Sequence, residues 1–92
     1  MIEFLLHDAK DTVGVAVVDI QGGKEVHGRA LQGKATPKVK ALMDIPLGHK
    51  IALRDFKPGD TVIKYGVDIG KVVAPIKLGE HVHVHNLKTK RW

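Results

Sequence analysis

Three histidines near the end of the chain, His81, His83 and His85, are spaced two residues apart with valines between them. Successive side chains of a β-strand point to opposite faces, so a strand here would carry imidazoles on one face and valines on the other. Neighbouring imidazoles would lie about 6.5–7 Å apart, close enough for two of them to bind one metal ion. The outer two would be about 13 Å apart, so all three could share an ion only if the strand contained a bulge. The pattern indicates a metal or substrate site, and the alternative is a solvated edge strand without function.

Two further motifs combine basic and polar side chains with glycine. In "GHK", His49 and Lys50 follow Gly48 and begin a strand, so they point to opposite faces unless the turn relaxes this rule. His49 has the chemistry of a metal ligand or an acid–base catalyst, and Lys50 that of a carboxylate-binding residue. In "IKYG", we expect Lys64 to bind a substrate or act as a base, and Tyr65 to place its hydroxyl at the rim of a site. For each of these residues the alternative is an ordinary surface position in a turn or strand.

Length and composition describe a small basic domain. We expect one domain, residues 1–92, with a thin aliphatic core, because only four residues are aromatic: Phe4, Phe56, Tyr65 and Trp92. The chain contains no cysteine, which excludes disulfides and thiolate metal sites and suits a reducing cytoplasm. The N-terminus has no signal-peptide pattern, and the longest purely apolar run, "VAVV", is far too short to span a membrane. We therefore expect a cytoplasmic protein that does not interact with membranes.

The formal net charge of +5 favours anionic ligands. Nucleic acid is not expected among them, because the basic residues are scattered and no aromatic stacking platform accompanies them. Small acids, including sugar acids, are the better match to this charge.

Hydrophobic periodicity favours short strands and gives no sign of a helix of ordinary length. The expected strands are rich in β-branched residues and are separated by Gly, Pro or Asp signals; they cover residues 12–20, 24–31, 39–45, 49–55, 60–66, 69–76 and 81–86. This spacing predicts an all-β barrel or sandwich.

An eight-residue pattern recurs among these strands. Each copy has a hydrophobic second residue, a glycine in fifth place, and Ile or Val in eighth place. The copies are "DIPLGHKI" from Asp44, "DFKPGDTV" from Asp55, "PIKLGEHV" from Pro75 and the looser "DIQGGKEV" from Asp19. Because glycine adopts positive φ at little cost, each copy predicts a turn that leads into a strand.

The stretch from Asp44 to Leu87 resembles the SAF-type domain of the altronate and galactarate dehydratase family, and the small subunit of the related sulfolactate sulfo-lyase. The motifs "GHKIALRD", "VIKYG" and "VHVHNL" carry the resemblance, which covers about half of the chain. It implies a compact β-clip fold of short strands. It also implies β-elimination from a hydroxy or sulfo acid with a divalent metal, Fe(II) or Mn(II).

The resemblance also assigns roles to residues within these motifs. His83 and His85 are expected to bind the metal, whereas His81 is not counted as part of the motif. The other expected site residues are His49 and Lys64 for catalysis, and Lys50, Tyr65 and Asn86 for substrate binding.

Single-chain members of this family continue into a much longer catalytic region, whereas this chain stops at Trp92. We therefore expect the small subunit of a metal-dependent sugar-acid dehydratase, of the altronate or galactarate type. It would act on a small sugar-acid anion only together with a large catalytic subunit, and homo-oligomerisation is compatible with this expectation.

Three alternatives remain open. The first keeps the same chemistry and is the small subunit of a sulfolactate-type sulfo-lyase. The second is a non-catalytic SAF-like module that binds carbohydrates or anions. The third is a basic nucleic-acid binder, whose affinity would fall steeply with salt.

Overall fold

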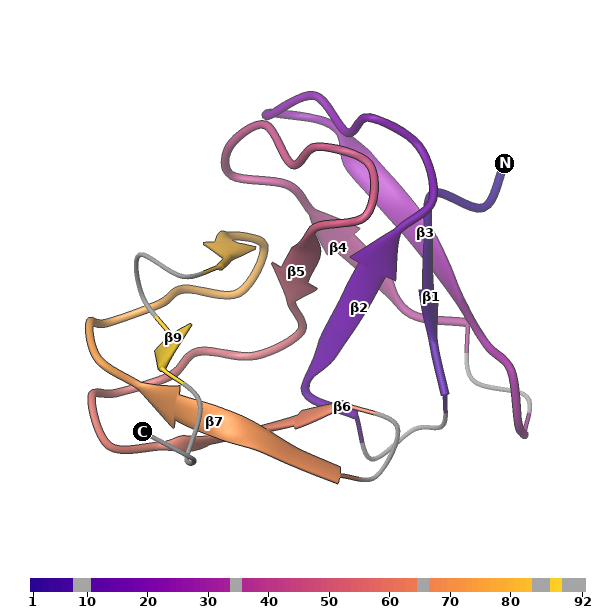
Figure 1. The fold of residues 1–92 in the computed structure, drawn as a ribbon. Helices are drawn as coiled ribbons and strands as arrows, with labels where there is room; N and C mark the ends of the chain where they lie inside the picture. Colours follow the sequence, from indigo (N-terminus) through magenta and orange to yellow (C-terminus); the bar gives the residue numbers. More distant parts are fainter. Residues whose placement is uncertain (8–10, 34–35, 65–66, 84–86, 89–92) are drawn as a thin grey trace.

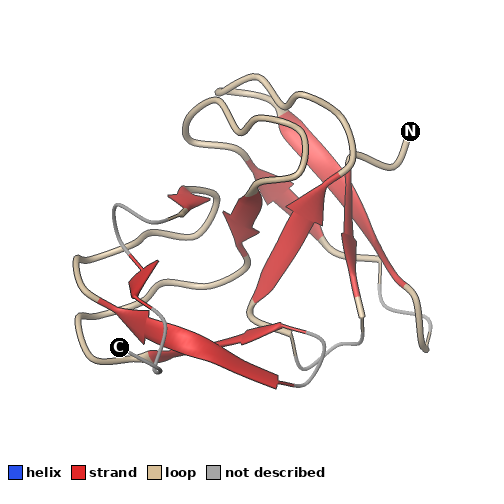
Figure 2. Cartoon of the chain, viewed as in Figure 1, coloured by secondary structure: helices blue, strands red, loops and turns tan. Residues whose placement is uncertain are grey.

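The strands of the chain form two connected sheets. The computed structural model describes residues 1–7, 11–33, 36–64, 67–83 and 87–88, and every regular element in these ranges is a strand (Figure 1, Figure 2). The strands are β1 (Phe4–Leu6), β2 (Val13–Ala16), β3 (Glu25–Ala30), β4 (Lys38–Lys40), β5 (Lys50–Ala52), β6 (Thr61–Lys64), β7 (Val67–Val72), β8 (His81–Val82) and β9 (Leu87–Lys88). The all-β prediction is confirmed, although most strands are shorter than the sequence pattern indicated. No helix in the described ranges has the length and apolarity needed to cross a membrane.

The larger sheet has the strand order β4-β3-β1-β2-β5-β8, and the smaller has the order β6-β7-β9. Only the β1–β3 pair is parallel among the described pairs; the others are antiparallel. The sheets are joined where Thr12, just before β2, donates its N–H to the Ile63 carbonyl in β6 at 2.9 Å, and accepts the Ile63 N–H on its side chain. In Figure 1 the smaller sheet crosses beneath the lower ends of β2 and β5. The result is a curled half-barrel, as expected for a β-clip fold.

The core consists of two clusters of mainly aliphatic side chains, each with one phenylalanine. Phe4 in β1 is fully buried, and its ring lies across Gly14 in β2 and Gly28 in β3. A Cβ atom at either glycine would collide with the ring, so both strands need glycine to approach β1. The second cluster surrounds Phe56, which is 3% exposed, beside the smaller sheet.

The recurring eight-residue pattern is confirmed as a recurring turn. We call the four copies turn 1 (19–26), turn 2 (44–51), turn 3 (55–62) and turn 4 (75–82). The fifth residues have positive φ, namely 89° at Gly23, 85° at Gly48, 93° at Gly59 and 90° at Gly79. The second residues form antiparallel bridges, Ile20 with Ile45 and Phe56 with Ile76. The turns therefore work in two pairs, turn 1 with turn 2 and turn 3 with turn 4.

Backbone hydrogen bonds are exchanged within each pair. In every turn the glycine N–H donates to the carbonyl of the residue three positions before the partner turn. The four bonds are Gly23 to Ala41, Gly48 to Ala16, Gly59 to Val72 and Gly79 to Ala52, at 2.7–2.9 Å. Each turn thereby fixes the end of the strand that precedes its partner turn.

Side chains reinforce the first pair reciprocally. The Asp19 carboxylate, which begins turn 1, accepts the N–H of Leu47, the fourth residue of turn 2, at 2.9 Å. The Asp44 carboxylate, which begins turn 2, accepts the N–H of Gly22, the fourth residue of turn 1, at 2.8 Å.

The second pair keeps only one of these two bonds. The Asp55 carboxylate, which begins turn 3, accepts the N–H of Leu78 in turn 4 at 2.7 Å. The reverse bond, from the fourth residue of turn 3 to the first residue of turn 4, cannot form. Its donor position is Pro58, which has no N–H, and its acceptor position is Pro75, which has no carboxylate. Donor and acceptor are lost together, so no polar group is left without its bond.

A third bond distinguishes turn 2 from turns 3 and 4. In turns 3 and 4 the carboxylate of the sixth residue accepts the N–H of the third: Lys57 to Asp60 at 2.8 Å and Lys77 to Glu80 at 2.7 Å. In turn 2 the third residue is Pro46, which has no N–H, and the sixth is His49. The His49 side chain is therefore not needed to close its own turn.

We expect Gly28→Ala to destabilise the domain by about 1–3 kcal/mol, because the added methyl group overpacks the core against Phe4. Urea unfolding followed by far-UV circular dichroism measures this loss. Adding Phe4→Leu should recover part of it by making room. A Gly28→Ala protein with unchanged unfolding free energy would contradict the packing described here.

Giving turn 2 the third and sixth residues of turn 4 should preserve the fold. In the double variant Pro46→Lys with His49→Glu, the new carboxylate can accept the new backbone N–H, as in turn 4. We expect its unfolding free energy to stay within about 1 kcal/mol of the natural chain. His49→Glu alone should be less stable than the double variant, because its carboxylate has no such donor. Equal stability of the two variants in urea would show that the bond does not form.

Candidate metal centre

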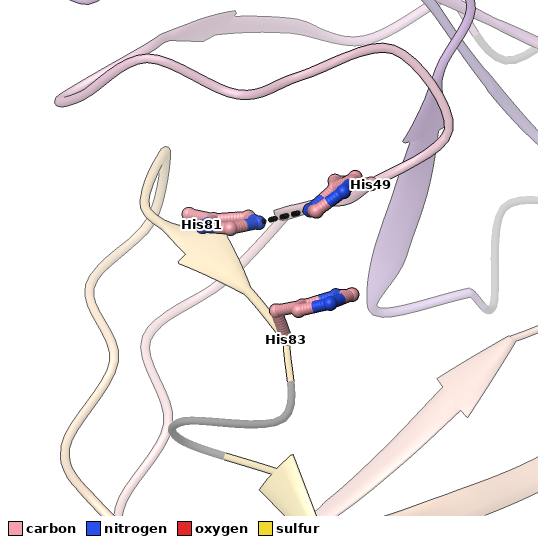
Figure 3. A group of neighbouring side chains, drawn as sticks. All are labelled: His49, His81 and His83. Carbon is pink, nitrogen blue, oxygen red and sulfur yellow. Dashed lines mark hydrogen bonds between the residues drawn. The ribbon is translucent and has the colours of Figure 1, made fainter.

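Strands β5 and β8 bring three histidines to one face of the larger sheet. The antiparallel register pairs Ile51 with His81. Extended by two residues, past the start of β5 and the end of β8, the same register sets His49 opposite His83. Since side chains two residues apart share a face, all three imidazoles come to the same side (Figure 3). Each is half-buried.

The three rings are in direct contact with one another. Nδ1 of His49 and Nε2 of His81 are joined by a hydrogen bond of 2.8 Å, so one of these nitrogens carries the proton and the other accepts it. The rings of His49 and His83 are stacked with centroids 4.1 Å apart and planes 22° apart. The rings of His81 and His83 lie 5.4 Å apart and are nearly parallel, at 12°.

This arrangement fits a divalent metal ion. One nitrogen from each of the three imidazoles lies within 4.8 Å of the other two. Neighbouring ligand nitrogens with bonds of about 2.0–2.1 Å are roughly 2.9 Å apart around an octahedral ion and 3.3 Å around a tetrahedral one, so the nitrogens would have to approach one another by at most about 1.9 Å. Rotation of the half-buried rings supplies a movement of this size. The stacked rings must turn so that their lone pairs converge, which exchanges the hydrogen bond and the stacking for metal bonds.

The sequence prediction identified part of this group. His83 was expected to bind metal and His49 to bind metal or to act in catalysis, and the structure brings both into the cluster. His81 was left out, yet it belongs to the cluster. His85 lies outside the described residues, so its role as a ligand stays a prediction. The expected imidazole and valine faces are present as far as the structure describes the strand, since Val82 is fully buried.

The other predicted site residues are not placed in the cluster. Lys50 is half-buried and begins β5 directly after His49. Strand alternation therefore directs its side chain to the face opposite the imidazoles. The backbone of Lys64 ends β6, in the smaller sheet. Tyr65 and Asn86 lie outside the described residues. The substrate-binding and catalytic roles of these four residues remain predictions.

Two signals in the sequence point to the cluster once the turns are aligned. His49 occupies a turn position at which turns 3 and 4 use a carboxylate to cap their own backbone. The Pro46 that precedes it removes the N–H that such a carboxylate would accept. A histidine in that place is therefore available for chemistry. The pairing of β5 with β8, which brings His81 within reach, is not visible in the sequence because 32 residues separate the two histidines.

Comparisons with known proteins identify the family. The model of the altronate/galactarate dehydratase SAF domain matches residues 2–90. The chain is 51% identical over 92 residues to the (2R)-sulfolactate sulfo-lyase subunit alpha of Chromohalobacter salexigens, covering 99% of this chain and 98% of that protein. It is 60% identical over 55 residues to the protein of the same name from Paracoccus pantotrophus, covering 60% of this chain and 82% of that protein.

A second group of relatives is much longer. The altronate dehydratase of Bacillus subtilis is 39% identical over 89 residues, which is 97% of this chain but 17% of that enzyme. All of these relatives are named as lyases or dehydratases. With a family match over residues 2–90 and a relative that is 51% identical along nearly its whole length, the chain belongs to the altronate/galactarate dehydratase SAF-domain family.

Proposed function

We propose that this chain is the small subunit of a sulfolactate-type sulfo-lyase and acts together with a large catalytic subunit in the cytoplasm. The observation that carries the proposal is the 51% identity to a sulfo-lyase subunit alpha along nearly the whole of both chains. That relative is named as a subunit, and the match covers 98% of its length.

The sequence motifs favour an altronate- or galactarate-type dehydratase, with the sulfo-lyase as the alternative. The comparisons support the alternative better, because identity to altronate dehydratase falls to 39% and covers only 17% of that enzyme. The family and the lyase class are common to both. The difference lies in the leaving group, which is hydroxide in one case and sulfite in the other.

The proposed reaction is a β-elimination. A base removes the proton on C2 of sulfolactate, next to the carboxylate. The electrons of that C–H bond form the C2–C3 double bond, and those of the C3–S bond leave with sulfite. The resulting enol takes up a proton at C3, loses the proton of its C2 hydroxyl and becomes pyruvate. The reaction therefore needs a base, cationic stabilisation of the enolate oxygens, and binding of two anionic groups.

Residues of this chain supply part of these needs. His49, His81 and His83 would hold a divalent ion, which when bound supplies Lewis-acid stabilisation of negative charge on the substrate oxygens. Three imidazoles suit Fe(II), whereas Mn(II) prefers oxygen ligands and would depend more on other groups. Lys50 remains the candidate for binding an anionic group, and Lys64 for the base.

We expect the isolated chain to bind Mn(II) or anaerobic Fe(II), and His81→Gln to weaken binding at least tenfold. Loss of a mere outer-shell partner already costs about 10–100-fold, and loss of a ligand should cost no less. Isothermal titration calorimetry or electron paramagnetic resonance of free Mn(II) measures the change.

The matched control is His27→Gln, which makes the same substitution in a half-buried histidine that contacts Glu3 outside the cluster. It should bind metal as the natural chain does. His85→Gln tests the remaining predicted ligand. If His81→Gln binds metal normally while His85→Gln does not, the assignment of the cluster is wrong.

We expect affinity-tagged chain to recover a large subunit from its native lysate under reducing conditions, and the recovered pair to release sulfite from (2R)-sulfolactate. Neither chain should do so alone. A panel that includes altronate and galactarate distinguishes the two substrate classes. Dehydration of a sugar acid without sulfite release would overturn the sulfo-lyase assignment in favour of the dehydratase.

A further inference from the structure

We infer that the large subunit docks beside strands β5 and β8 and completes the coordination of the ion held by His49, His81 and His83, so that metal binding and subunit assembly are coupled. The inference rests on the proposed function and extends it to a specific surface and a shared metal centre.

The first argument is the number of ligands. Within the described residues, the three imidazoles form the one group of three or more potential metal ligands, and the group contains no carboxylate. An octahedral Fe(II) or Mn(II) ion has six coordination positions. A hydroxy acid bound through its carboxylate and hydroxyl would fill two of the three that remain. One position is then left. We assign it to a carboxylate of the large subunit, which is a ligand that both metals accept; His85 of this chain is the competing candidate.

The second argument is the location of the cluster. Among the described strands, β8 is the last in the order of the larger sheet, and it pairs there with β5. The three imidazoles are half-buried, so part of each ring reaches the surface. An ion held here would lie at the border of the domain, within reach of a second chain.

Exposed leucines lie in the turns that lead to the cluster. Leu47, two residues before His49, is 61% exposed, and Leu78, three residues before His81, is 44% exposed. Leu42 adds to the second patch, since it is 47% exposed and its N–H donates to the carbonyl of Gly79, next to Leu78. Exposed apolar surface of this kind marks sites of protein interaction.

The turns themselves do not require these leucines. Leu47 and Leu78 are the fourth residues of turns 2 and 4, which lead into β5 and β8. The fourth residues of turns 1 and 3 are Gly22 and Pro58, and those turns close equally well. Exposed leucine thus occurs only in the two turns that precede the histidine strands, where a docking surface beside the metal would need it.

The comparisons identify the occupant. In altronate dehydratase the segment like this chain is 17% of one long polypeptide, so the domain is covalently joined to a larger catalytic region. In the sulfo-lyase the matching chain is a separate subunit. Separation leaves a surface that must be recognised without a covalent link. We therefore assign the surface around the cluster to the large subunit rather than to a second copy of this chain.

Coupling makes a reciprocal prediction. If the large subunit completes the ion's coordination, saturating Mn(II) should tighten subunit binding by about 5- to 150-fold, and the large subunit should tighten Mn(II) binding by the same factor. Calorimetric titration of the chain with the large subunit recovered above, with Mn(II) and with a chelator, measures the first factor. Mn(II) titration of the chain alone and of the pair measures the second.

Variants separate the contribution of the exposed leucines to assembly from that of the metal ion. Leu47→Ser with Leu78→Ser should weaken assembly at least tenfold but leave Mn(II) binding by the isolated chain unchanged. Leu31→Ser, which alters a 57% exposed leucine far in sequence from the cluster, should change neither. His81→Gln should abolish the dependence of assembly on Mn(II).

The outcomes distinguish this inference from the proposed function. If no large chain is recovered, the proposed function fails. If a pair assembles and releases sulfite, but Mn(II) affinity is the same for the chain and the pair, only the inference is overturned. It is also overturned if Mn(II) makes the chain alone sediment as a dimer through the leucine surface.

Discussion

The structure depends on the hydrogen bonds that paired turns exchange through their glycines. The described part of the chain has no helix, and its strands are two to six residues long, so the strands alone offer few backbone bonds. Each turn glycine donates its N–H to the carbonyl three residues before the partner turn, and thereby fixes the end of one strand against the beginning of another. Most of these contacts join residues distant in sequence. The fold is consequently held together more by hydrogen bonds between paired turns than by long runs of strand pairing.

This network has a direct effect on the site. The Gly79 bond to Ala52 ties turn 4 to the end of β5, so β8 must run antiparallel to β5 from its first residue. The register that follows is the one that sets His49 against His83 and leaves His81 diagonal to it. The Gly48 bond to Ala16 fixes the other end of β5 in the same way. Hydrogen bonds made by backbone atoms therefore determine which imidazoles meet.

Much of the fold could be predicted from the sequence, and the site only in part. The β-branched runs and turn residues indicate an all-β domain, and the glycine in fifth place correctly marks a repeated turn. Strand alternation correctly puts His81 and His83 on one face and Val82 in the core. Alternation along one strand cannot identify the cross-strand neighbour. The third member of the cluster, His49, lies just before β5, and the pairing of β5 with β8 is set by contacts between distant turns. The family motif includes His83 and not His81, so only the geometry of the strand pair reveals that His81 belongs to the cluster.

The matched prolines have a consequence for how four similar turns find their correct partners. Turns 1 and 2 each carry an aspartate in first place and an N–H in fourth, so they suit each other. Turn 3 has the aspartate without the N–H, and turn 4 has the N–H without the aspartate. If turn 3 paired with turn 1, the exposed carboxylate of Asp19 would face Pro58 and lose the N–H that it accepts in the native pair. Pro58 and Pro75 thus favour the native pairs, because other combinations of these similar turns are less stable.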